Sequence, residues 1–159
     1  MFGLFKKKPT EEEFRTAIQN GIIYPSNSIS VLQIQTESGK PATAWINKGY
    51  KNYKYKSFCP WFLKLQIGFS QLNQDELGNI DMAEIEDYIE DKFKQIGITH
   101  FIGRFVTDSG MDILLYTEPK NEFENLINQL AQKNKYNLDI GCELNEADSK
   151  WTSMKMVLR

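Results

Sequence analysis

The sequence predicts an α+β fold: a ferredoxin-like split βαβ sandwich (βαββαβ) preceded by a helix and a β-hairpin that extends or flanks the antiparallel sheet. Three observations predict this fold. Residues 61–70 alternate apolar and polar side chains, as a strand with one buried face does. Residues 81–97 carry apolar side chains at helical spacing. Two extended runs within residues 99–117 flank a turn that contains glycine, which indicates a hairpin.

A short helix and a hairpin come first along the chain. Thr10 and Glu13 have the spacing of a capping box, so we expect the helix to begin there and to end near Gly21. Residues 28–37 and 42–47 are extended runs, and the Ser-Gly-Lys-Pro segment between them is typical of a turn. These two runs are expected to pair as a hairpin.

The sandwich then supplies two helices and the remaining strands. After a loop at residues 73–79, Asp81 is expected to cap a helix, with Glu84 completing a capping box. The last strand is expected over residues 136–143, where apolar and polar side chains alternate. The second helix presents four apolar residues on one side: Phe123, Leu126, Ile127 and Leu130.

Right-handed crossovers determine the order of the four sandwich strands. They place the strands that start at Trp61 and Met111 in the middle of the sheet, and those that start at Thr99 and Tyr136 outside them. The first and last of these strands are then antiparallel neighbours.

This strand order makes a prediction about the two cysteines. Cys59 precedes the first sandwich strand and Cys142 lies at the end of the last one. We therefore expect nearby but unbonded thiols, with Cα atoms no more than about 10 Å apart.

The composition describes a globular chain of 159 residues, long enough to bury a core, with a net charge of −2. Residues 1–60 hold 9 basic and 4 acidic side chains, a net charge of +5, whereas residues 61–159 hold 10 and 17, a net charge of −7. We divide the chain into an N-terminal extension with a short helix, residues 1–27, and a single α+β domain, residues 28–159. Two cysteines without CxxC spacing, and no run of about 20 apolar residues, favour a cytoplasmic protein with no membrane span.

No complete catalytic, cofactor-binding or metal-binding signature is present in the sequence, so we predict a non-enzymatic protein without a cofactor or a metal. The alternative is an enzyme of unknown type whose site is assembled from scattered residues, which a deep pocket joining His100 to acidic side chains would indicate. The single histidine, His100, has no partner at motif spacing, which favours a structural or surface role over catalysis. It lies in an extended run and is expected to share a face with Ile102, Arg104 and Val106.

The helix that begins at Asp81 carries the leading candidate for a binding surface. Glu84, Asp87 and Asp91 recur on its outward side, where like charges repel by roughly a few tenths of a kcal/mol per pair. Glu86 and Glu90 lie in the same outward arc, and Glu90 can pair with Lys94. A basic partner would relieve the repulsion. We therefore expect a protein-binding module that regulates or neutralises a partner, such as a nuclease or toxin, as an inhibitor or immunity protein does. Its contact residues would be Glu84, Asp87, Glu90 and Asp91, and the alternative is a merely solvated helix face.

Residues 48–58 interleave lysines with aromatic side chains, a combination that neutralises phosphates and stacks on unpaired bases. A nucleic-acid-binding module is therefore the second functional hypothesis. The other interpretation of this segment is a loop or edge strand with inward tyrosines and solvated lysines. The nucleic-acid contacts would be Lys51, Tyr53, Lys54, Tyr55 and Lys56.

The hairpin within residues 99–117 has large apolar side chains on both faces, so its second face needs cover. We expect the N-terminal helix or the tail around Trp151 to supply this cover. A second copy of the chain, in a homo-oligomer, or another protein are the alternatives.

Spaced landmarks run through most of the sequence: Gly39-Lys40-Pro41, Asn47, Pro60-Trp61, the acidic helix from Asp81, Gly103-Arg104 with Thr107, Gly110, Tyr116, and Asp148 with Trp151. With these residues the chain resembles the bacterial domain-of-unknown-function family 695 from about Ser28 to Leu158. The family has no established activity. Some members look related to, or joined with, a ferredoxin-like regulator of ribonuclease E, so the resemblance implies an inhibitory binding role by analogy.

Overall fold

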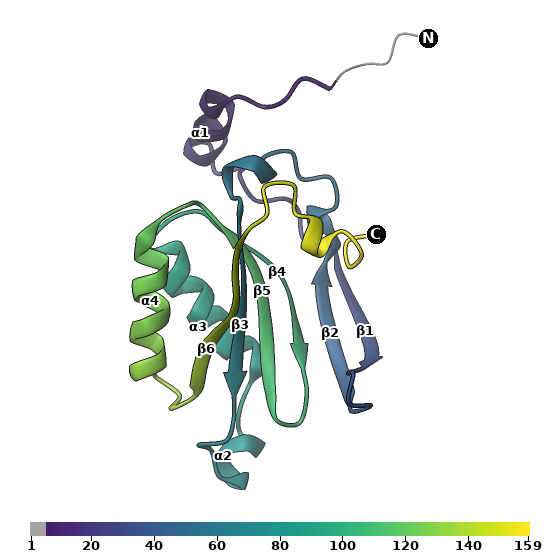
Figure 1. The fold of residues 1–159 in the computed structure, drawn as a ribbon, viewed down its shortest axis with the longest axis vertical. Coiled ribbons are helices and arrows are strands. Elements are labelled where there is room, and N and C mark those ends of the chain that lie inside the picture. Colours follow the sequence, from purple (N-terminus) through teal and green to yellow (C-terminus); the bar gives the residue numbers. More distant parts are fainter. Residues whose placement is uncertain (1–5) are drawn as a thin grey trace.

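The computed structural model describes residues 6–159, so the first five residues of the N-terminal extension lie outside the described part. It has an α+β fold in which six strands form one antiparallel sheet in the order β1-β2-β4-β5-β3-β6 (Figure 1). The strands are β1 (Ile29–Gln35), β2 (Pro41–Asn47), β3 (Trp61–Gly68), β4 (Thr99–Val106), β5 (Gly110–Thr117) and β6 (Asp139–Ala147). The α-helices are α1 (Glu11–Gln19), α2 (Gln74–Gly78), α3 (Met82–Lys94) and α4 (Asn121–Gln132), and short 3-10 helices cover Lys48–Tyr50, Lys56–Phe58 and Thr152–Met154.

The four strands of the predicted sandwich lie in the expected order. β3 and β5 form the central pair, β4 and β6 lie outside them, and each pairing is antiparallel. The N-terminal hairpin extends the sheet, because β2 pairs with β4 over residues 43–46. The two long helices α3 and α4 cover one face of this sheet (Figure 1).

The helix starts follow local capping chemistry. At α1 the Thr10 hydroxyl accepts the Glu13 N–H at 3.2 Å and the Glu13 carboxylate accepts the Thr10 N–H at 2.8 Å, as predicted. At α3 the predicted cap at Asp81 is confirmed, but the predicted capping box with Glu84 is wrong, because Asp81 accepts the N–H of Ala83, at 2.8 Å, and not that of Glu84. The loop predicted at residues 73–79 is instead the short helix α2, because Asn73 and Glu76 form their own capping box there.

One extra residue in β4 changes which of its side chains share a face. The pairing with β5 shifts between Phe101 and Gly103, so Ile102 is the extra residue of a β-bulge. His100 therefore contacts tyrosines on the face opposite the helices, whereas Arg104 reaches α3 on the helix face. The assignment of these two side chains to one face is wrong, because it assumed an unbroken strand.

The last strand lies farther along the chain than predicted, over Asp139–Ala147 and not residues 136–143, and this separates the cysteines. β6 continues to Ala147, which pairs with Trp61 at the start of β3. Cys142 pairs instead with Leu65, six residues beyond Cys59, which is about 20 Å along an extended chain. The expected proximity of the thiols is wrong although the strand order is right, and both cysteines are free.

Apolar side chains form a core on each face of the sheet. Between the sheet and α3 and α4, the core includes Leu63, Leu65, Ile67, Ile85, Ile89, Phe93, Phe101, Ile113, Leu115, Phe123 and Leu130. On the other face, α1, the 48–58 segment and the C-terminal tail supply a second core that includes Phe14, Ala17, Tyr50, Tyr55, Phe62, Ile102, Leu114, Tyr116, Trp151, Met154 and Leu158. The chain therefore covers its own second face, as predicted. The cover lies at the end where β3 begins and leaves the other end open.

Candidate functional site

The predicted contact residues of α3 lie on the side of the helix away from the sheet. Ile85 and Ile89 are buried against the sheet, whereas Glu84, Asp87 and Asp91 are exposed. None of these three carboxylates makes an ion pair with a residue of the described chain, 6–159. We call Glu84, Asp87 and Asp91 the acidic face.

The other two acidic residues of the predicted arc are compensated by cations. Glu90 pairs with Lys94, as expected from their spacing. Glu86 turns toward the sheet and accepts a hydrogen bond from Arg104 at 2.7 Å. Burial raises the pKa of Glu86, and Arg104 opposes this shift. The Arg104 guanidinium also lies 4.7 Å from the centre of the Trp45 ring. Glu90 and Glu86 therefore border the acidic face without adding free charge to it.

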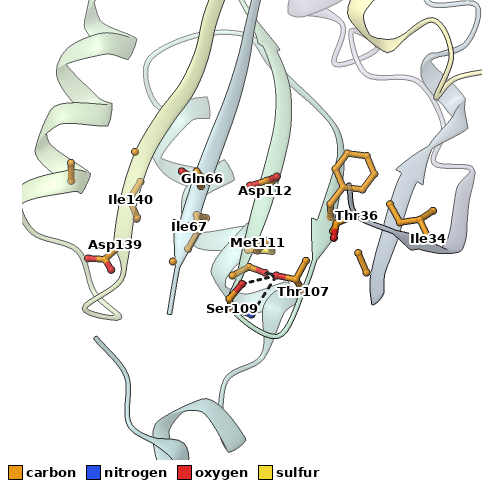
Figure 2. A pocket seen from close by; sticks show the side chains of 16 residues that line it. Ile34, Thr36, Gln66, Ile67, Thr107, Ser109, Met111, Asp112, Asp139 and Ile140 are labelled. Carbon is orange, nitrogen blue, oxygen red and sulfur yellow. Dashed lines mark hydrogen bonds between the residues drawn. The ribbon is translucent and has the colours of Figure 1, made fainter. Parts of the chain in front are cut away.

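A cavity of about 600 Å³ lies on the open end of the second sheet face (Figure 2). Gln66 on β3 and Asp112 on β5 supply polar groups from the central strands, and Ile34 on β1 supplies an apolar wall. Thr107 and Ser109, whose hydroxyls are 3.2 Å apart, close the end at the β4–β5 turn. The volume lies in the range of small-molecule sites, about 300–1,000 Å³. The cavity can hold a molecule with both apolar and hydrogen-bonding parts.

An ion network crosses three strands beside this cavity. Lys64 on β3 lies 3.0 Å from the Glu143 carboxylate on β6 and 3.5 Å from the Asp112 carboxylate on β5. Glu143 is the extra residue of a bulge in β6, where the register shifts. Burial lowers the pKa of Lys64, but the two carboxylates outweigh it and leave the pKa raised. Burial raises the pKa of Asp112, and Lys64 offsets only part of that shift. This network was not predicted from the sequence, where its one visible signal is the single lysine on the polar side of β3.

The aromatic residues of the 48–58 segment point into the protein. Tyr50 and Tyr55 are 4% and 5% exposed, and Tyr53 is half-buried. Lys51 and Lys54 are exposed, and Lys56 is half-buried with its ammonium 5.7 Å from the centre of the Trp151 ring. This arrangement matches the interpretation of inward tyrosines and solvated lysines. The ring of Tyr55 packs against Phe14 of α1 and is not open to a base.

His100 is the centre of a buried aromatic cluster. Its Nε2 lies 2.9 Å from the Tyr53 hydroxyl and its Nδ1 lies 3.2 Å from the Tyr50 hydroxyl. A neutral imidazole has one donor and one acceptor nitrogen, so both hydroxyls are matched. Burial, helped by the charge of Lys94, lowers the pKa of His100 to about 3. The histidine is therefore neutral near pH 7, and each of its ring nitrogens has a hydroxyl partner.

Asp148 links the C-terminal tail to the sheet by hydrogen bonds. Its carboxylate accepts hydrogen bonds from the Tyr116 hydroxyl at 2.7 Å, from the Thr152 N–H and hydroxyl at 2.8 and 2.7 Å, and from the Ser153 N–H at 2.9 Å. Trp151 stacks on Tyr116 with ring centres 4.2 Å apart. Asp148 is not the N-cap of the 3-10 helix Thr152–Met154, which is Trp151, so no capping signal in the sequence indicates this role.

Two kinds of feature are absent from residues 6–159. Residues 6–159 contain no group of three or more His, Cys, Asp or Glu side chains arranged to hold a metal ion. Within the same residues, no helix has both the length and the apolar character needed to cross a membrane.

Comparison with known proteins gives one match. A model of a family of unknown function, DUF695, matches residues 64–155, which run from within β3 to beyond β6 and do not include the N-terminal hairpin. Neither the curated proteins nor the solved structures give a match. The matched region covers more than half of the chain and includes α3, the bulge of β4 and Asp148. The chain therefore belongs to the DUF695 family, as its sequence landmarks indicated.

Proposed function

We propose that this chain is a non-enzymatic protein-binding module that regulates or neutralises a basic protein partner through the acidic face of α3. The observation that carries the proposal is the exposure of Glu84, Asp87 and Asp91 without a cation at ion-pair distance among residues 6–159. A nuclease or toxin with a positive surface would be one such partner.

The spacing of the acidic face supports a binding role on energetic grounds. Asp87 follows Glu84 by three positions and precedes Asp91 by four, so the three carboxylates are neighbours along one stripe of the helix. Each like-charge pair costs roughly a few tenths of a kcal/mol in the free protein. A basic partner removes this cost, and its attraction to the stripe speeds association at low salt.

The test compares the wild-type chain with a Glu84→Lys, Asp87→Lys, Asp91→Lys variant as baits for proteins from the source cell. A matched control changes three exposed carboxylates elsewhere by the same charge: Glu37→Lys, Glu122→Lys and Glu124→Lys. We expect a partner that the wild type and the control retain, that the α3 variant loses, and that salt releases. Equal capture by all three proteins would reject the acidic face as the contact surface.

We also infer that residues 61–147 adopt a ferredoxin-like arrangement. The order β4-β5-β3-β6 with antiparallel pairing throughout, together with α3 and α4 on one face, supports this topology. An experimental structure in which one of the four strands changes place would contradict it.

The nucleic-acid hypothesis has weaker support. Lys51 and Lys54 remain exposed and can meet phosphates, but the ring of Tyr55 belongs to the second core. Stacking on bases through this ring would require the core to open. Binding of single-stranded RNA at low salt that falls steeply with added salt, and falls further in a Lys51→Ala, Lys54→Ala variant, would favour this hypothesis over the acidic face.

A further inference from the structure

β1 is an edge strand that lacks the usual protection against pairing. Within residues 6–159 it pairs only with β2, and residues 29–35 contain no charged side chain, proline or bulge. Large apolar side chains on both faces of β1 are open to solvent: Ile29 is 55% exposed, Val31 55%, Leu32 44% and Ile34 37%. A long, uncharged, apolar edge of this kind is a template for another strand.

The strand at the opposite edge of the sheet, β6, is protected against pairing with another strand. β6 carries Asp139, Glu143 and Glu146, and the bulge at Glu143 breaks its regular pairing geometry. Charges and bulges are the devices by which edge strands resist association. Their presence on β6 and absence from β1 identify β1 as the edge suited to accept a strand.

The pairing with β2 determines which backbone groups of β1 face outward. Just beyond the two ends of β1, the Thr36 N–H donates to the Lys40 carbonyl at 2.9 Å and the Ser28 carbonyl accepts the Lys48 N–H at 2.7 Å. The even-numbered residues of this segment therefore form the hydrogen-bonded pairs with β2. Hydrogen-bonded residues alternate in an antiparallel pair. The outward N–H and C=O groups therefore belong to the odd-numbered residues Ile29, Val31, Gln33 and Gln35.

We propose that this chain forms a symmetric homodimer in which β1 pairs antiparallel with β1 of a second copy about a two-fold axis at Leu32. In this register every residue with outward N–H and C=O groups has a partner. Ile29 pairs with Gln35 of the second copy, and Val31 pairs with Gln33 of the second copy. An axis shifted by one residue leaves one outward residue without a partner. The two sheets continue into each other, and Leu32 faces its own copy on the side of the 600 Å³ cavity.

A second copy of this chain fits β1 because the strand is neutral and complementary to itself. Two identical charged strands would place like charges opposite each other, and residues 29–35 avoid this completely. Pairing of β1 with the acidic β6 of another copy would be head-to-tail and would build open chains. The two-fold arrangement closes after two copies and buries both exposed edges at once.

The first experiment measures the mass of the full chain by sedimentation over a wide range of concentrations, beside a Leu32→Lys variant. We expect a monomer–dimer equilibrium for the wild type and a monomer for the variant, because the variant places two ammonium groups opposite each other at the axis. Leu32 is half-exposed, so the circular dichroism of the variant should be unchanged. A wild type that stays monomeric, or one that grows into long chains, would overturn the proposal.

The second experiment tests the axis by disulfide formation in a Cys142→Ser background, in which the remaining Cys59 is buried. At the axis the two Leu32 Cα atoms lie about 4.5 Å apart, within disulfide reach, so Leu32→Cys should cross-link under mild oxidation. Val31→Cys is the matched control, since its diagonal separation of about 7–8 Å is too long. Cross-linking of the Val31→Cys protein as readily as of Leu32→Cys would contradict this register.

Discussion

The contacts of Asp148 predict that Asp148→Asn loosens the C-terminal tail and lowers the stability of the protein. The carboxylate is 8% exposed and accepts four hydrogen bonds, two of them from the backbone N–H groups of Thr152 and Ser153. Asparagine has the same size but only one accepting oxygen. Whichever way the amide is placed, its NH₂ group meets one of these two N–H groups.

The expected loss follows from that mismatch. One hydrogen bond from a backbone N–H to the charged carboxylate is lost, and two donor groups then face each other. Hydrogen bonds to charged groups contribute about 1.5–3 kcal/mol. The remaining bonds lose their charged partner and weaken. We expect the free energy of unfolding to fall by about 2–3 kcal/mol, which corresponds to a drop of about 4–12 °C in Tm for a chain of this size.

The pH dependence gives an independent check of the same contacts. Burial would raise the pKa of Asp148, but the hydrogen bonds from Tyr116, Ser153 and Thr152 outweigh it and hold the pKa well below its usual range. A carboxyl group whose pKa is depressed by folding stabilises the protein fully above its unfolded pKa of about 3.9, and this contribution is lost as the pH falls below that value. The difference in free energy of unfolding between the wild type and Asp148→Asn should therefore be constant near neutral pH. It should become smaller below about pH 4.

Urea denaturation followed by circular dichroism, at a series of pH values, measures both quantities. Asp108→Asn is the matched control, because Asp108 is exposed in the β4–β5 turn and its side chain makes no hydrogen bond with residues 6–159. Its stability should equal that of the wild type. An Asp148→Asn protein as stable as the control at pH 7 would refute the reasoning. A difference in free energy of unfolding from the wild type that does not decrease in acid would also refute it.

Three other predictions concern the bulge, the histidine and the first helix. Gly103→Ala should lower the free energy of unfolding by about 1–3 kcal/mol, because its Cβ would lie 2.3 Å from the Trp45 carbonyl oxygen; Gly141→Ala, with open space around it, is the control in the same urea titration. The ring resonances of His100 should stay constant from about pH 8 to about pH 5 in an NMR titration, since burial lowers its pKa to about 3. A titration midpoint near pH 6.5 would contradict the burial of the ring. Phe14→Ala should cost about 3–5 kcal/mol in the same assay, and a loss below about 1 kcal/mol would mean that α1 does not unfold together with the sheet.

Sequence patterns predicted most of the fold because its elements follow local rules. The capping box at Thr10, the alternation of β3 and the turn before Pro41 each produced an element close to its predicted bounds. The strand order followed from crossover handedness. The main errors lie in register. The bulge at Ile102 and the extension of β6 to Ala147 depend on contacts between strands, which a single strand pattern does not contain.

The candidate site was predictable to a lesser degree, for a related reason. Helical spacing places Glu86 and Asp87 side by side in the same outward arc, and nothing in α3 itself distinguishes them. The difference comes from β4, where the bulge turns Arg104 to the helix face and toward Glu86. That bulge in turn depends on Gly103, because the neighbouring backbone of Trp45 leaves no room for a Cβ. In an unbroken β4, Arg104 would share the face of His100, and Glu86 would lack its cation. The bulge in β4 therefore selects which carboxylates of α3 remain without a cation.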